Sequence, residues 1–238
     1  MNRLINFQIK NLFKQKFYYV CLFLFVFMYP VLDYISTLNI PELEVIKVMP
    51  QFINLLSGGG TIISIVFIVL FTCLDFNEGT TKNIIGRGYT RNQLLISKYT
   101  TTLIGVFSFY IISFFAILIL FGKNGFGYEN YMLYSSINSV IRIIAYTILY
   151  TTMSFILEKN TSSILACLFI PSIIQTIFSL IDSKMNIEVS KYWIDNVAGS
   201  FIENPNTFNF IYSIIFYIVY IIIFIVLGTS LIKKKEIK

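Results

Sequence analysis

Long apolar runs separated by short polar stretches form the main pattern of this chain. Six runs are long enough to cross the hydrocarbon core of a membrane, which needs about 20 apolar residues per helix. They lie at about residues 17–36, 54–74, 95–121, 132–157, 161–181 and 208–232. The runs are continuously apolar, whereas the strands of a membrane barrel alternate apolar and polar residues. The pattern therefore predicts an all-α membrane protein, with residues 1–238 as one transmembrane domain of six spans.

Composition and charge agree with this prediction and add a topology. Hydrophobic residues make up 56% of the chain and charged residues only 13%, with a mean hydropathy of +0.76. Of the 18 Lys and Arg residues, thirteen fall in segments that are inside if the N-terminus is inside, four fall outside, and Arg142 lies within a span. This positive-inside bias predicts both termini in the cytoplasm and an even number of crossings. The basic residues are mostly Lys, and Ile, Asn, Phe and Tyr are frequent, which is typical of an AT-rich bacterial genome and indicates a bacterial plasma-membrane protein. The positive-inside bias also accounts for the net charge of +6 without a nucleic-acid partner.

Residues 2–16 are expected to form an amphipathic helix that lies along the inner membrane surface before the first span. Its apolar face holds Ile5, Ile9, Leu12 and Phe13, and its polar face holds Arg3, Asn6, Lys10 and Lys14. The alternative is a basic extension that only sets the orientation of the first span. Within that span, Pro30 is expected to kink the helix.

The polar stretch at residues 75–94, between the second and third runs, carries the most functional information. Residues 76–86 are expected to form about three helical turns, with Ile84 and Ile85 as an apolar pair. Thr90 is placed to cap the helix that begins the third span. A short helix of this kind suits docking into a groove on another protein, and the alternative is an ordinary solvated loop.

The residues of this stretch resemble the coupling loop of ABC-2 type transporter permeases. The next membrane helix, which has Lys98 near its start, is preceded by an acidic residue, then by Gly79-Thr80, Arg87 and Arg91. The chain departs from the pattern at Gly88, where many members of that family have Pro. The resemblance implies an ABC-2 (type V exporter-like) fold. It also implies that seven residues form or shape the contact with a separate ATPase: Asp75, Glu78, Gly79, Thr80, Lys82, Arg87 and Arg91.

The same resemblance implies a function and partners. The chain would be the non-catalytic permease subunit of an exporter, paired with a second permease subunit and with a cytosolic ABC ATPase dimer that binds ATP and Mg²⁺. Similar small permeases serve lantibiotic immunity, bacitracin resistance and export of phenol-soluble modulins, so the expected cargo is an amphipathic or antimicrobial peptide or a hydrophobic antibiotic. The chain itself has no GxxxxGK[ST] or HExxH motif and no His, so no catalytic residue, metal site or cofactor is expected in it.

Two readings from other classes stay open. One is a secondary transporter, which needs no ATPase, and the other is a membrane scaffold or sensor whose loop docks a signalling partner. A secondary transporter needs charged or unwound sites near the membrane midplane, and Arg142 is the one basic residue deep in a span. Arg142 and Asp33 are candidates for the translocation path, and the alternative is a structural role for Arg142 as a partner of Asp33 or of backbone carbonyls.

The longest outer segment, residues 182–206, separates the last two spans. Tyr192 and Trp193 are expected to anchor a short helix of this segment at the outer membrane interface. The resemblance to ABC-2 permeases implies a role for this segment near the outer gate.

Overall fold

The computed structural model describes residues 1–31, 34–35, 61–121, 129–185, 188–194, 196–197 and 207–234. All regular secondary structure in these ranges is helical, which confirms the all-α prediction. Four long helices are α7 (Arg91–Phe121), α8 (Glu129–Leu157), α9 (Asn160–Met185) and α11 (Thr207–Lys234). Helix α8 is the centre of the fold, because it contacts α7, α9, α11 and also α5 (Thr61–Asn77).

Four helices in the described part of the chain are long and apolar enough to cross a membrane: Arg91–Ile117, Tyr134–Leu157, Asn160–Met185 and Thr207–Ile232. A fifth crossing is possible by the same test if α5 and the short helix that follows it are taken together, although they are bent by 66°. These helices indicate a membrane protein, as the apolar runs predict.

The first predicted span, residues 17–36, is helical as far as the structure describes it continuously. It contains α2 (Lys16–Val26) and a π-helical turn over Phe27–Val31. Pro30 lies inside that turn, and since proline removes an intrahelical hydrogen bond, a local change of helix type at this position is the expected effect. Residues 32–33 and 36 lie outside the described residues, as does the predicted start of the second span at residues 54–60.

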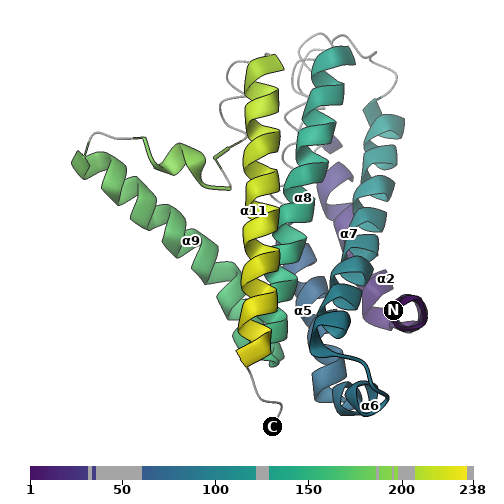
Figure 1. Cartoon of the computed structure of the whole chain (residues 1–238). Helices are drawn as coiled ribbons and strands as arrows, with labels where there is room; N and C mark the ends of the chain where they lie inside the picture. Colours follow the sequence, from purple (N-terminus) through teal and green to yellow (C-terminus); the bar gives the residue numbers. More distant parts are fainter. Residues whose placement is uncertain are drawn as a thin grey trace.

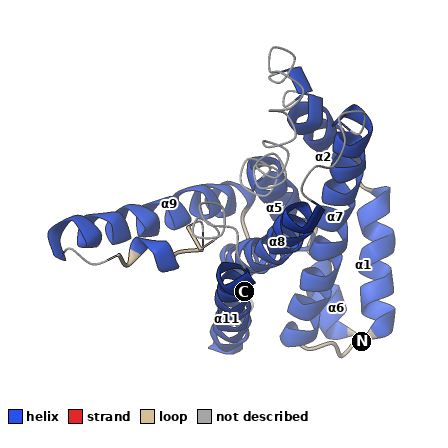
Figure 2. Cartoon of the chain, turned by 90° about the horizontal axis from the view of Figure 1, so that it is seen from above, coloured by secondary structure: helices blue, strands red, loops and turns tan. Residues whose placement is uncertain are grey.

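The N-terminal helix α1 (Asn2–Lys14) runs across the bundle axis, since it is seen end-on in Figure 1 and lengthwise in Figure 2. It has three faces rather than two, each made of residues at helical spacing. The face against the bundle is buried and consists of Leu4, Gln8 and Leu12. The predicted apolar face lies beside it, with Ile5 and Ile9 half-buried and Phe13 exposed, and the exposed basic face contains Arg3, Lys10 and Lys14.

The turn between α8 and α9 is short, as the sequence predicts. Glu158 has a positive φ of 61°, the left-handed conformation that ends many helices. From this turn α9 diverges from the other long helices, as Figures 1 and 2 both show. Only 11% of the apolar window of α9 is buried, against 56% for α8, so α9 makes most of its contacts near its first half.

The buried apolar residues form two clusters. The larger cluster runs through α2, α5, α7, α8 and α11 and includes Phe67, Phe71, Phe109 and Tyr217. The smaller cluster lies at the end of the bundle near α1 and consists of Leu4, Ile84, Leu94, Leu95, Tyr99, Ile148, Phe155 and Ile232. It joins the N-terminal helix to the stretch that the sequence singles out.

Candidate functional site

A sharp bend follows α5 and produces the most distinctive local structure. The predicted single helix over residues 76–86 is wrong in detail, because α5 continues to Asn77 and a separate helix, α6 (Thr80–Gly86), then begins. The two axes differ by 66°. Gly79 lies between them with φ 68°, a backbone conformation that glycine adopts at little cost. Helix α6 therefore lies beyond the end of the bundle in Figure 1.

Asp75 lies just before the bend, and its carboxylate is buried: the residue is only 1% exposed. Three side chains from three other helices meet it. Gln8 of α1 donates to Oδ2 at 2.6 Å, Thr80 of α6 donates to Oδ1 at 3.0 Å, and the Nζ atom of Lys98 in α7 lies 3.0 Å from Oδ2. A buried carboxylate is tolerated only when it is paired and hydrogen-bonded in this way.

The partner of this carboxylate, Lys98, is fully buried as well. Its ammonium group donates a second bond to the backbone carbonyl of Phe71 at 2.9 Å and lies 4.2 Å from the centre of the Phe71 ring. An ammonium has three N–H donors, so these contacts nearly saturate it. We call Gln8, Asp75, Thr80 and Lys98 the Asp75 cluster. It joins α1, α5, α6 and α7 through directional bonds.

Helix α6 is amphipathic. Within α6, Thr81 and Ile84 are buried against the bundle, whereas Lys82 and Asn83 are exposed. Glu78, just before the helix, and Arg87, just after it, are exposed as well. The single proton of the Thr80 hydroxyl is shared between Oδ1 and the backbone carbonyl of Asp75, which lies 3.2 Å away at the end of α5. The charged face of α6 is therefore presented away from the bundle by a helix that is fixed at its first residue.

The turn after α6 leads into α7 through a capping box. The Thr90 hydroxyl accepts a bond from the backbone N–H of Gln93 at 3.3 Å, which confirms the predicted cap, and the Gln93 side chain accepts one from the backbone N–H of Thr90 at 2.9 Å. Such reciprocal bonds fix the start of a helix. Gly88 has φ 89°, which proline cannot adopt because its φ is fixed near −65°. The departure at Gly88 therefore has a conformational cause in this chain.

The structure separates the seven predicted coupling residues into different environments. Asp75 and Thr80 belong to the Asp75 cluster, Gly79 forms the bend, and Glu78, Lys82 and Arg87 are exposed. Arg91, the first residue of α7, is half-buried and lines a separate small cavity of about 20 Å³ with Phe155 and Glu158 among others. The residues thus divide into an internal support and an exposed surface.

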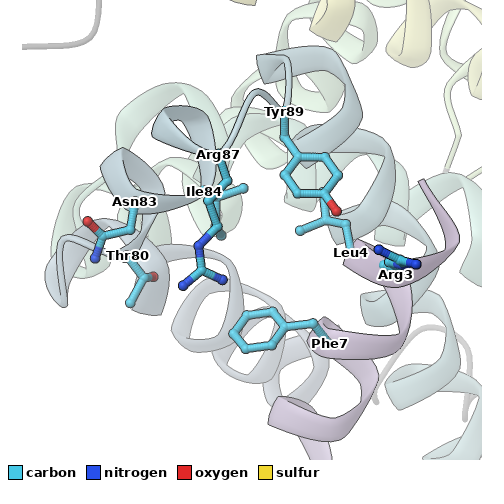
Figure 3. Close-up of a pocket in the computed structure, with 8 residues that line it drawn as sticks. All are labelled: Arg3, Leu4, Phe7, Thr80, Asn83, Ile84, Arg87 and Tyr89. Carbon is cyan, nitrogen blue, oxygen red and sulfur yellow. The ribbon is translucent and has the colours of Figure 1, made fainter.

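A larger cavity of about 460 Å³ lies between α1 and α6. Its lining residues are Arg3, Leu4, Phe7, Thr80, Asn83, Ile84, Arg87 and Tyr89. In Figure 3, Arg87 reaches from α6 towards Phe7 of α1, while the hydroxyl of Tyr89 points towards α1. The cavity joins the basic face of α1 to the charged face of α6.

The two candidates for the translocation path are not brought together within the described residues. Arg142 lies in the middle part of α8, is half-buried and has its guanidinium carbon 5.8 Å from the centre of the Tyr146 ring. Asp33 lies outside the described residues. Neither role offered for Arg142 is therefore tested.

The outer segment forms a small wedge between α9 and α11. The carboxylate of Asp182 accepts backbone N–H groups of Val189 and Ser190 at 2.6 and 2.9 Å, which positions the short helix Ser190–Tyr192. Trp193 is 6% exposed, and its ring packs edge-on against Phe178 of α9 and Tyr220 of α11 at centroid distances of 5.7 and 6.0 Å. Trp193 thus fills the angle between two helices, whereas Tyr192 remains exposed.

Two members of the Asp75 cluster were assigned no role from the sequence. Gln8 is a polar residue between Leu4 and Leu12 on the buried face of α1, and Lys98 is a charged residue inside an apolar helix. Each is costly to bury alone. A polar or charged residue among apolar residues on one helix face was therefore the signal in the sequence that could have indicated a buried partner.

Comparison with known protein families gives a match that covers most of the chain. The family described as "Protein of unknown function (DUF2705)" matches residues 17–238. The chain belongs to the DUF2705 family. No curated protein and no solved structure matches it. In this DUF2705 protein, Asp75, Thr80 and Lys98 lie inside the matched region, while Gln8 and the rest of α1 lie before it.

Proposed function

We propose that this DUF2705 protein is the membrane-spanning permease subunit of an ATP-driven exporter of the ABC-2 type, and that α6 is its docking helix. One observation carries the proposal. A short helix with an exposed charged face is held at the end of the bundle by a buried carboxylate that is bonded to α1, α6 and α7. A force applied to α6 would pass through these bonds to three other helices.

The proposal includes six spans with both termini in the cytoplasm of a bacterial cell and α6 on the cytoplasmic side. A separate ABC ATPase dimer binds ATP and Mg²⁺ and supplies the force. A second permease subunit, identical or homologous, completes the pathway. The apolar windows of α9 and α11 are only 11% buried within one chain, which leaves most of their surface for lipid and for this second subunit. The proposed cargo is an amphipathic or antimicrobial peptide or a hydrophobic antibiotic.

The test is co-purification of the full chain with the ABC ATPase encoded beside it, comparing wild type with the charge swap Glu78→Lys plus Lys82→Glu. Both side chains are exposed, and the swap leaves the net charge unchanged. We expect it to weaken the complex by about 10-fold or more, since like charges placed opposite each other at an interface cost several kcal/mol. ATP hydrolysis by the complex should fall with it.

The matched control is the charge swap Glu188→Lys plus Lys191→Glu in the outer wedge. These residues form an exposed ion pair at 2.8 Å, so the control also exchanges one acid and one base without changing net charge. We expect the complex with the ATPase to be unchanged. If no ABC ATPase of the source genome forms a complex with the wild-type chain, the proposal fails and the secondary-transporter or scaffold reading replaces it.

A further inference from the structure

The cavity between α1 and α6 has properties that docking of α6 does not require. Two arginines contribute to its lining, Arg3 from α1 and Arg87 from α6, and no carboxylate is among the lining residues. Among the described residues, neither guanidinium makes an ion pair or a side-chain hydrogen bond. Two cations that face one cavity without an internal partner repel each other slightly, and an anion placed between them would relieve that repulsion.

The rest of the lining suits an anionic group attached to an apolar body. Leu4, Phe7 and Ile84 form an apolar wall, while Asn83 and Tyr89 offer polar side chains beside the arginines. The volume of about 460 Å³ lies within the usual range of small-ligand sites, roughly 300–1,000 Å³. Guanidinium groups bind phosphate oxygens through paired N–H donors, which makes arginine well suited to phosphate recognition.

The position of the cavity favours a membrane lipid over a soluble ligand. Helix α1 lies across the bundle axis, and α6 lies beyond the end of the bundle (Figures 1 and 2). An amphipathic helix in this orientation sits at the level of the headgroups, where the inner leaflet presents anionic lipids. Arg3, on the exposed basic face of α1, would then lie at the level of these headgroups.

We propose that the cavity between α1 and α6 binds the phosphate group of an anionic phospholipid of the inner leaflet through Arg3 and Arg87. The bound headgroup links α6 to α1 on the solvent side of the Asp75 cluster. This proposal uses the cytoplasmic placement of α6 from the proposed function, but it does not require that an ATPase docks there.

The experiment is native mass spectrometry of the full chain in detergent, titrated with dioleoyl phosphatidylglycerol or with dioleoyl phosphatidylcholine. For wild type we expect the first phosphatidylglycerol adduct at about a 10-fold lower lipid concentration than the first phosphatidylcholine adduct, the factor that a charge-assisted bond supplies. The double variant Arg3→Gln plus Arg87→Gln should lose this preference. The control Lys10→Gln plus Lys14→Gln removes the same charge from residues of the basic face that do not line the cavity, and it should keep the preference.

A second variant protects the test against misfolding of the double variant. Asn83→Trp changes an exposed lining residue, keeps both arginines and narrows the cavity, so it should also reduce the preference for phosphatidylglycerol. Equal adducts of the two lipids in wild type, or an equal loss in the lysine control, would overturn the proposal in favour of a diffuse basic surface.

Two further outcomes would identify a different ligand. Displacement of the phosphatidylglycerol adduct by millimolar inorganic phosphate would overturn the lipid source and assign the cavity to a free anion. If Arg3→Gln plus Arg87→Gln abolishes ATPase binding and leaves the lipid preference intact, the cavity receives a segment of the ATPase instead. Failure of the ATPase complex in wild type, with the lipid preference present, would overturn the proposed function alone.

Discussion

Two regions of the molecule are held by different kinds of contact. At the α6 end, four helices meet at a buried carboxylate through bonds of 2.6 to 3.0 Å. In the wedge, α9 and α11 are separated by aromatic packing around Trp193, with hydrogen bonds mostly to backbone groups. Hydrogen bonds and ion pairs depend strongly on direction, whereas apolar packing does not. The comparison therefore predicts that the angle of α6 is held more tightly than the angle of α9.

The largest expected effect tests the α6 end. Asp75→Asn leaves the ammonium of Lys98 as an uncompensated buried charge, and breaking such a pair typically costs about 3–5 kcal/mol. Thermal unfolding of the detergent-purified protein should therefore shift to a clearly lower temperature. Glu78→Gln, which changes an exposed acid three residues away, should leave it unchanged.

The double variant Asp75→Asn plus Lys98→Met sharpens this test. Because it removes both charges together, it should be more stable than either single variant. If the double variant loses as much stability as the two single variants together, Asp75 and Lys98 do not act as a pair. The contrast between the Asp75 cluster and the Trp193 wedge would then fail.

The part of this end that could be predicted from sequence is the part with a local signal. Thr90 precedes a helix and has Gln93 three residues later, which is the pattern of a capping box. Ile84 and Ile85, an apolar pair in a polar stretch, predicted the apolar side of α6 from local sequence. The position of the break was missed, since an apolar run continuing to Asn77 gives no sign of a bend except Gly79, and a single glycine is tolerated within many helices.

The Asp75 cluster could not be assembled from sequence because its members are far apart. Gln8 and Asp75 are separated by 67 positions, and no periodic pattern relates them. Lys98 lies near the start of its predicted span and Arg142 lies deep in its own, yet Lys98 is fully buried whereas Arg142 is half-buried. Only tertiary packing distinguishes a charge that supports the fold from one that lies nearer its surface.

A smaller and more local loss of stability is expected at the Trp193 wedge. Trp193→Ala removes the ring between Phe178 and Tyr220, and truncation of a buried Trp costs about 3 kcal/mol or more. Since the ring of Trp193 packs against α9 and α11, the loss should appear as local opening of these helices. Hydrogen–deuterium exchange should rise in the second half of α9, with little change in α6 and the start of α7.

Tyr192→Ala is the control for the wedge. Its ring is 41% exposed, and its carbonyl, which accepts the hydroxyl of Tyr220 at 2.6 Å, is retained by alanine. The expected cost is about 1 kcal/mol, the value of one aromatic contact. Exchange that rises equally throughout the bundle in Trp193→Ala would show that the wedge is as tightly coupled as the Asp75 cluster.

The smallest effect concerns the ion pair Glu188–Lys191, which has the same charges as Asp75–Lys98 but is exposed. The bond of 2.8 Å raises the pKa of Lys191 above its ordinary value. A raised lysine pKa contributes stability below the ordinary pKa, and this contribution is lost as the pH rises through the raised value. Solvent screening makes such a pair weak, so Glu188→Gln should leave the unfolding temperature unchanged within error at pH 7. A decrease in unfolding temperature at pH 7 as large as that of Trp193→Ala would mean that ionic contacts hold the wedge. The contrast between the wedge and the Asp75 cluster would then disappear.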